Sequence, residues 1–437
     1  MIGRMSRALL VPLLLCVLAP LQVFSAAPAD FTRWFVDGTI RIDLAHRGDA
    51  EAGSFELLAI YEEGAWAGRR EKLAEPDSLG KYRFSVRDLA TGTVLFEGGY
   101  SSLFGEWQTT EEAKKRKREF VEVVRFPKPR ASFILAISER GPDGGFKDVF
   151  TSAKLAPEMA GPAARPSAKT LDLHISESPD RALDIVFIGD GYDAGNQDKL
   201  ERDLSWFARV LLRVPPFDRY KARISIRAVM PVSRDNGPDE PGRKIFNQSA
   251  LECSFSTFGS ARYLTPGNER KLRDLAGLVP YDTVIVIVNT PRYGGAGIYN
   301  AWAVAASDSE YNEYLMAHEF GHSFAGLADE YYSSAVSYSD FYPKGVEPPE
   351  PNITALIGGR EQLKWKAFVR DDIPVPTPVG KGWDSEVGVF EGAGYAAKGL
   401  FRPMVDCKMF SKKNRDYCPV CMKAVEDMIK SHTGEME

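Results

Sequence analysis

Histidine and cysteine are scarce in this chain, with five residues of each among 437. Any site that needs several imidazoles or thiols must therefore draw on few positions. Charge of one sign is lacking as well, because 55 lysines and arginines face 60 acidic residues and the formal net charge is -5. This balance gives no electrostatic reason to expect a nucleic-acid partner. We interpret the one strongly basic run, KKRKR at residues 114–118, as a solvated surface.

Long apolar runs are absent beyond the first 25 residues, so no membrane-spanning helix is expected in the rest of the chain. The N-terminus carries Arg4 and Arg7, then the apolar run ALLVPLLLCVLAPLQVF, then small residues. This pattern predicts a secretory signal peptide over residues 1–25. We therefore expect an exported protein, secreted or periplasmic, with no stable membrane insertion.

Removal of the signal peptide would take away Cys16 and leave Cys253, Cys407, Cys418 and Cys421. An even number of cysteines in an exported chain favours two disulfides, with three possible pairings. The CPVC sequence that contains the last two cysteines also fits a redox site or half of a zinc-binding knot.

The chain contains two regions with different hydrophobic patterns. Short alternating runs such as TIRIDL, FELLAIY and YRFSVRD, separated by turn-rich segments, predict an all-β sandwich domain over residues 28–157. The alanine- and proline-rich segment at 158–169 predicts a linker. In residues 170–437, the apolar run ALDIVFIG, the helical spacing of DKLERDLSWFARVLLRV and further strand candidates lead to another helix. This order predicts an α/β (α+β) lobe.

The most specific chemical signal is HEFGH at residues 318–322. Positions i and i+4 share one face of an α-helix, so His318 and His322 can reach the same ion while Glu319 lies beside it. In the H-E-x-x-H pattern two imidazoles bind Zn²⁺, and the glutamate takes a proton from a water that the metal activates. The apolar YLMA before the motif and Gly326 after it fit a buried helix that ends soon after the second histidine.

A hydrolytic zinc site needs a third protein ligand. Three further histidines lie outside this helix, and none stands where the chain turns back after it: His46, His174 and His432. This favours an acidic ligand. Asp329 and Glu330 follow the helix closely and both are candidates, and Glu361 is a more distant one.

HEFGHSFAGLADEYY resembles the IgA-peptidase family of zinc metallopeptidases, relatives of the metzincins. Further stretches are similar to that family: LDIVFIGDGY, NTPRYGGAGIYN, SFSTFGSARYLT, VGVFEGAGY and FRPMVDCKM with CPVC. The resemblance implies a metzincin-like lobe after the family's N-terminal domain, with zinc ligands His318, His322 and Asp329 and general base Glu319. The G-x-x-D spacing favours Asp329 over Glu330, although the segment before the glycine is one residue longer than in ordinary metzincins.

The resemblance also implies features around the zinc. Metzincins place a methionine in a tight turn beneath the ion, and Met409 is the first candidate and Met404 the second. The glycine-rich YGGAGI segment is expected either as an edge strand that pairs with an extended peptide or as a turn. Tyr331 and Tyr332 are candidates for stabilising an oxyanion.

These features predict a secreted zinc endopeptidase that hydrolyses peptide bonds of protein substrates. The alternative is a catalytically silent surface-binding protein that uses the β-sandwich for recognition. The intact set His318, Glu319 and His322 counts against this alternative, because a protein that has lost its activity has no need of the base. Metal content and the activity of Glu319→Gln distinguish the two.

Overall fold

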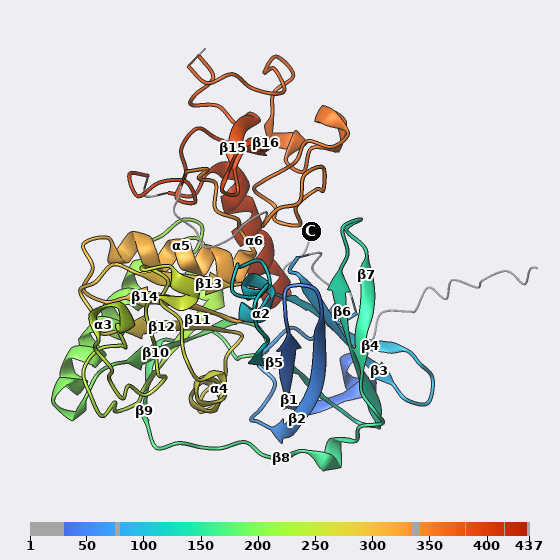
Figure 1. Cartoon of the computed structure of the whole chain (residues 1–437). Coiled ribbons are helices and arrows are strands. Elements are labelled where there is room, and N and C mark those ends of the chain that lie inside the picture. The colour runs from blue at the N-terminus through green and yellow to red at the C-terminus, as the bar shows by residue number, and fades with distance from the viewer. Residues whose placement is uncertain (1–29, 75–78, 334–340, 381, 415, 435–437) are drawn as a thin grey trace, which may run out of the picture.

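The computed structural model describes residues 30–74, 79–333, 341–380, 382–414 and 416–434. The predicted signal peptide lies outside these residues. The described chain forms a strand-rich N-terminal part and a larger mixed α/β part, which lie side by side (Figure 1). Within the described ranges, no helix combines the length and the apolar character that crossing a bilayer requires.

The N-terminal part contains two four-stranded sheets. In spatial order the first is β5 (Arg118–Pro129), β1 (Phe35–Gly48), β2 (Gly53–Glu62) and β8 (Gly161–Pro162), and the second is β4 (Val94–Tyr100), β3 (Tyr82–Asp88), β6 (Phe133–Arg140) and β7 (Phe146–Thr151). Neighbouring strands are antiparallel except β2 and β8. Alternate residues such as Ile40, Ile42 and Phe84 are buried in one core shared by both sheets, as the period-two pattern requires. The strand-rich N-terminal domain is therefore confirmed, with two short helices, α1 (Phe31–Trp34) and α2 (Leu103–Trp107).

The predicted linker at 158–169 contributes to both parts. Its residues 161 and 162 form β8, which pairs with β2, and β9 begins at Lys169. The segment between them crosses from one part to the other (Figure 1).

The second part is built on a six-stranded mixed sheet. Its spatial order is β13 (Gly295–Ile298), β14 (Trp302–Ala306), β12 (Thr283–Val288), β10 (Leu183–Asp190), β11 (Ile224–Met230) and β9 (Lys169–His174). The four central strands are parallel, and the two edge strands run antiparallel to their neighbours. Successive residues of β10 enter different cores, Phe187 on one face and Val186 on the other. Burial on both faces explains the uninterrupted apolar run.

Helices cover this sheet. They are α3 (Gln197–Leu211), α4 (Glu269–Ala276), α5 (Asn312–Ala325) and α6 (Pro419–Thr433), and a small hairpin of β15 (Phe390–Ala393) and β16 (Ala396–Arg402) lies beyond them. Short 3₁₀ helices join the elements: Pro157–Met159, Ala194–Asn196, Lys221–Arg223, Pro241–Arg243, Thr257–Gly259, Gly359–Gln362 and Lys366–Phe368. The predicted α/β lobe is confirmed at the level of a mixed α/β fold.

The close approach of α5 to β13 and β14 depends on glycine. A Cβ at position 297 would overlap the carbonyl oxygen of Glu319 and come within 2.7 Å of the His322 Cβ. The YGGAGI segment forms β13, an edge strand of the sheet, so the strand prediction is confirmed and the turn prediction is wrong.

The two predicted disulfides are absent from the structure. All four cysteines in its described part are free and buried. Cys253 packs in one core of the α/β part, whereas Cys407, Cys418 and Cys421 pack in the other. The even number of cysteines therefore misled the prediction, because one of the four has no other cysteine in its core.

Candidate active site

Helix α5 directs His318 and His322 toward a single point. Their Nε2 atoms lie 3.2 Å apart. The Asp329 Oδ1 atom lies 3.1 Å from the first and 3.3 Å from the second. Asp329 reaches this point because Gly326 ends the helix in the left-handed region, at φ +59°, and the chain then turns back. The structure thus brings together the three residues for which a metal-binding role was predicted.

Backbone carbonyls fix the protonation of both imidazoles. The Nδ1 atom of His318 lies 3.1 Å from the carbonyl oxygen of Lys408, and that of His322 lies 2.5 Å from that of Leu327. A carbonyl oxygen only accepts, so each Nδ1 carries a proton and donates it. In the neutral imidazoles the two Nε2 atoms then present lone pairs to each other and to Asp329. Three acceptors in contact require a cation or an added proton between them.

The close contact of these groups shifts the pKa values of His322 and Asp329. Burial would lower the pKa of His322, but the Asp329 carboxylate outweighs it and raises that pKa to about 9. Burial would raise the pKa of Asp329, yet the imidazoles of His322 and His318 hold it well below the usual value. These shifts favour a protonated His322 beside an ionised Asp329 when no metal is bound.

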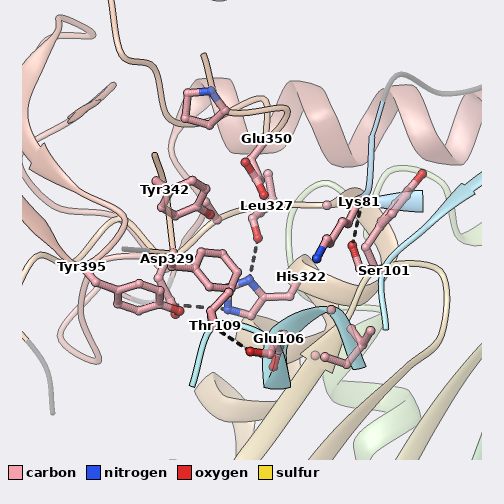
Figure 2. A pocket seen from close by; sticks show the side chains of 18 of the residues that line it. Lys81, Ser101, Glu106, Thr109, His322, Leu327, Asp329, Tyr342, Glu350 and Tyr395 are labelled. Carbon is pink, nitrogen blue, oxygen red and sulfur yellow. Dashed lines mark hydrogen bonds and ion pairs between the residues drawn. The ribbon is translucent and has the colours of Figure 1, made fainter. Parts of the chain in front are cut away.

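The donor set fits a zinc ion. Two nitrogens bound to one tetrahedral zinc lie about 3.3 Å apart, close to the separation of the two Nε2 atoms. Asp329 Oδ1 is buried, and its only partners among the described residues are the two Nε2 atoms, whereas its Oδ2 accepts a hydrogen bond from the Tyr395 hydroxyl at 2.6 Å. One carboxylate oxygen is thus fixed by the protein, and the other lies close to both imidazoles. Figure 2 shows Asp329 between Tyr395 and His322.

Glu319 lines the same cavity beside the histidines. Burial raises its pKa, and the two neighbouring imidazoles partly counter that effect. A Cβ at Gly295 of β13 would come within 3.1 Å of the Glu319 Oε1 atom. The absence of a side chain at 295 therefore leaves room for this carboxyl group.

Glu330 points away from the two histidines. Its backbone N–H donates to the Met409 carbonyl at 2.9 Å, and its Oε1 accepts from the Asn352 amide at 3.1 Å. The same oxygen lies 3.1 Å from the Cys421 Sγ atom. Glu361, the distant candidate, is exposed and forms an ion pair with Lys366.

Met409 is fully buried under α5. Gly321 lies between the two histidines in the sequence, and a Cβ added to it would be 3.2 Å from the Met409 Sδ atom. Met404 is only partly buried and packs against the outside of the same core. The placement beneath the histidines thus favours Met409 over Met404.

An open cavity of about 740 Å³ contains these side chains. One side comes from the α/β part and includes Gly295, Gly297 and Tyr331. The other comes from the strand-rich part, whose cavity-lining residues include Lys81, Ser101, Ser102, Glu106, Thr109 and Arg140. Figure 2 shows several of these residues facing His322 and Asp329. Both parts of the chain therefore shape this cleft.

Several polar residues at the site were missed by sequence reasoning. Tyr395, from the turn between β15 and β16, holds Asp329, and the Tyr314 hydroxyl lies 3.1 Å from the His318 Nδ1. Arg262 donates to the Tyr331 hydroxyl at 3.0 Å. Tyr314 is one turn before His318 on the same helix, a spacing that could have indicated it. Tyr332 is 40% exposed and packs on Phe410, away from this arrangement.

Comparison with known families gives two matches. The model described as IgA Peptidase M64 matches residues 171–385 and 380–429. The model described as Peptidase M64 N-terminus matches residues 30–151. A search of curated proteins gave no significant match.

Proposed function

The chain belongs to the IgA peptidase M64 family, and from that membership we propose that it is an exported zinc-dependent endopeptidase acting on protein substrates. The family identifies it as a peptidase of a metal-dependent class. We propose four further points: that the ion is zinc, which residues hold it, that the lobe has a metzincin-like architecture, and that residues 1–25 direct export.

The observation that carries the proposal is the meeting of His318, His322 and Asp329 in an open cavity with Glu319 beside them. In the proposal the first three hold the ion. A bound zinc supplies a Lewis acid for the scissile carbonyl and lowers the pKa of the attacking water.

Glu319 is the proposed general base. It takes a proton from the attacking water and then passes that proton to the leaving amine. Its raised pKa, caused mainly by burial, suits this exchange because the carboxyl group can hold the proton between the two transfers.

Edge strand β13 supports binding of an extended peptide. Gly295 and Gly297 line the cavity, and a free strand edge can pair with a substrate main chain through hydrogen bonds. The 262–264 segment already pairs with Gly295, so the proposal places the substrate along the following residues of β13.

Tyr331 is the proposed stabiliser of the oxyanion that forms at the scissile carbonyl. Its hydroxyl accepts a hydrogen bond from Arg262 and lines the cavity. A hydroxyl polarised by a guanidinium is a better donor toward developing negative charge.

The strand-rich part provides a second side of the same cleft. This supports a role for that part in selecting substrates for the peptidase. A silent surface-binding protein, the alternative function, would use the same surface without needing Glu319.

The proposal is tested with the purified mature chain and an unfolded protein substrate. Chelation should abolish cleavage, and zinc should restore it. Glu319→Gln should retain the metal and lose about 10²–10⁴-fold in rate, as expected for loss of a general base. Glu313→Gln is the matched control, because Glu313 lies exposed on the same helix and should leave the rate unchanged. Full activity of Glu319→Gln would reject the mechanism.

A further inference from the structure

A second group of metal-binding side chains lies behind the candidate active site. Glu330, Cys407, Cys418 and Cys421 are all buried, and their ligand atoms lie within 4.8 Å of one another. They come from the residue after Asp329, from the turn that precedes Met409, and from the start of α6. The proposed hydrolysis uses none of them.

Their spacing fits coordination better than a disulfide. The Sγ atoms of Cys407 and Cys421 lie 3.8 Å apart. Bonded sulfurs lie about 2.0 Å apart. Two sulfurs bound to one tetrahedral zinc, each at about 2.3 Å, lie about 3.8 Å apart. The Glu330 Oε1 atom is 3.1 Å from the Cys421 Sγ and supplies a fourth donor.

Two backbone N–H groups are directed at sulfur atoms of this group. The N–H of Cys418 donates to the Cys407 Sγ at 3.2 Å, and the N–H of Cys421 lies 3.5 Å from the Cys418 Sγ. Such bonds stabilise a thiolate over a thiol. The Oε2 atom of Glu330 is buried and has no hydrogen-bond partner among the described residues. A carboxylate oxygen left in this state is costly unless a cation accompanies it.

We propose that Cys407, Cys418, Cys421 and Glu330 hold a second, structural zinc ion. Three thiolates and one carboxylate complete a tetrahedral set with no position left for substrate, which is the pattern of structural zinc sites. The thiol and carboxyl protons are released to solvent as the ion binds.

The position of this second ion explains what it would stabilise. Glu330 directly follows Asp329 in the chain. Lys408 directly follows Cys407, and its carbonyl oxygen accepts the hydrogen bond that orients His318. Cys418 and Cys421 fix the start of α6, which packs in the same core as α5. The structural ion would therefore hold the active-site aspartate and histidine in place without touching substrate.

Cobalt(II) substitution of the full mature chain tests this inference without any measurement of peptidase activity. Thiolate-to-cobalt charge transfer gives strong near-ultraviolet absorption, and the His318, His322 and Asp329 set contains no thiolate to produce it. We expect this absorption in the wild-type protein, together with two zinc ions per chain in the zinc-loaded form.

Two variants and one control assign the signal. Cys421→Ser should lose the charge-transfer absorption and one zinc per chain, whereas Asp329→Ala should keep the absorption and lose the other zinc. Cys253→Ser is the control, because Cys253 is equally buried but packs in the other core, and it should change neither quantity.

The wild-type protein alone decides the inference, so a variant that fails to fold does not obscure it. Cobalt-loaded protein without thiolate charge transfer overturns the proposal. So does an unreduced, denatured mass lower by two hydrogens. That mass shows one disulfide, and because only Cys253 of the four cysteines lies outside the cluster, the disulfide includes at least one of the proposed ligands. Either result leaves the proposed peptidase function intact, since chelation and Glu319→Gln test that function separately.

Discussion

Tyr395→Phe removes one hydroxyl group and tests whether Asp329 holds the catalytic metal. This hydroxyl donates to Asp329 Oδ2 at 2.6 Å, and the ring packs 5.5 Å from Tyr331 and 6.0 Å from Phe341 between centroids. Phenylalanine keeps the ring contacts. A hydrogen bond to a charged group contributes about 1.5–3 kcal/mol. Removal of an outer partner of a metal ligand typically lowers metal affinity about 10–100-fold, or about 1.4–2.7 kcal/mol. The two estimates agree, so we expect a zinc affinity 10–100-fold weaker.

Competition with a chromophoric chelator measures this affinity. Tyr192→Phe is the matched control. The Tyr192 hydroxyl also donates to an aspartate, Asp203 of α3, at 2.7 Å, but that aspartate is not a proposed metal ligand. Both variants should lose some stability, and only Tyr395→Phe should lose zinc affinity. Unchanged affinity in Tyr395→Phe, or equal losses in the two variants, would refute the reasoning.

Three further predictions concern the same site. Asp329→Ala should lose the catalytic zinc and all cleavage, measured by metal analysis and substrate digestion; retained metal in that site would contradict the ligand set. Zinc affinity should rise about tenfold per pH unit from about pH 6 to 8, because His322, with a pKa of about 9, must lose its proton when the ion binds; a titration series that shows no dependence on pH would count against this. Gly297→Ala should destabilise the protein by about 1–3 kcal/mol or more, because the new methyl group overlaps the Glu319 carbonyl. Gly64→Ala should not, because no described residue beyond its two chain neighbours lies within 4 Å of the new methyl group. Equal melting temperatures of the two variants would contradict the packing argument.

The local part of the site could be predicted because helix geometry alone determines it. Residues i and i+4 share a face, so the pairing of His318 with His322 follows from their spacing. The return of Asp329 depends on one further local feature, the left-handed turn at Gly326, which the glycine permits. The choice of Asp329 over Glu330 also agrees with the direction in which the two side chains point.

The distant contacts could not be predicted, because tertiary packing determines them. Tyr395 follows Asp329 by 66 residues and meets it only because the β15–β16 hairpin folds back. The strand-rich part lines the cleft from positions such as Lys81 and Glu106, and no local pattern marks those residues. The number of cysteines does not show where each one lies in the fold. Cys253 lies in a different core from the other three, so two disulfides could not be predicted from the count.

Anomalous X-ray scattering at the zinc edge, from crystals of the zinc-loaded mature chain, tests the central claim most directly. We predict an ion at the point where the Nε2 atoms of His318 and His322 meet the Asp329 carboxylate, with Glu319 beside it and outside its ligands. An ion held by Glu330 in place of Asp329, or no zinc signal between the two histidines, would contradict the account.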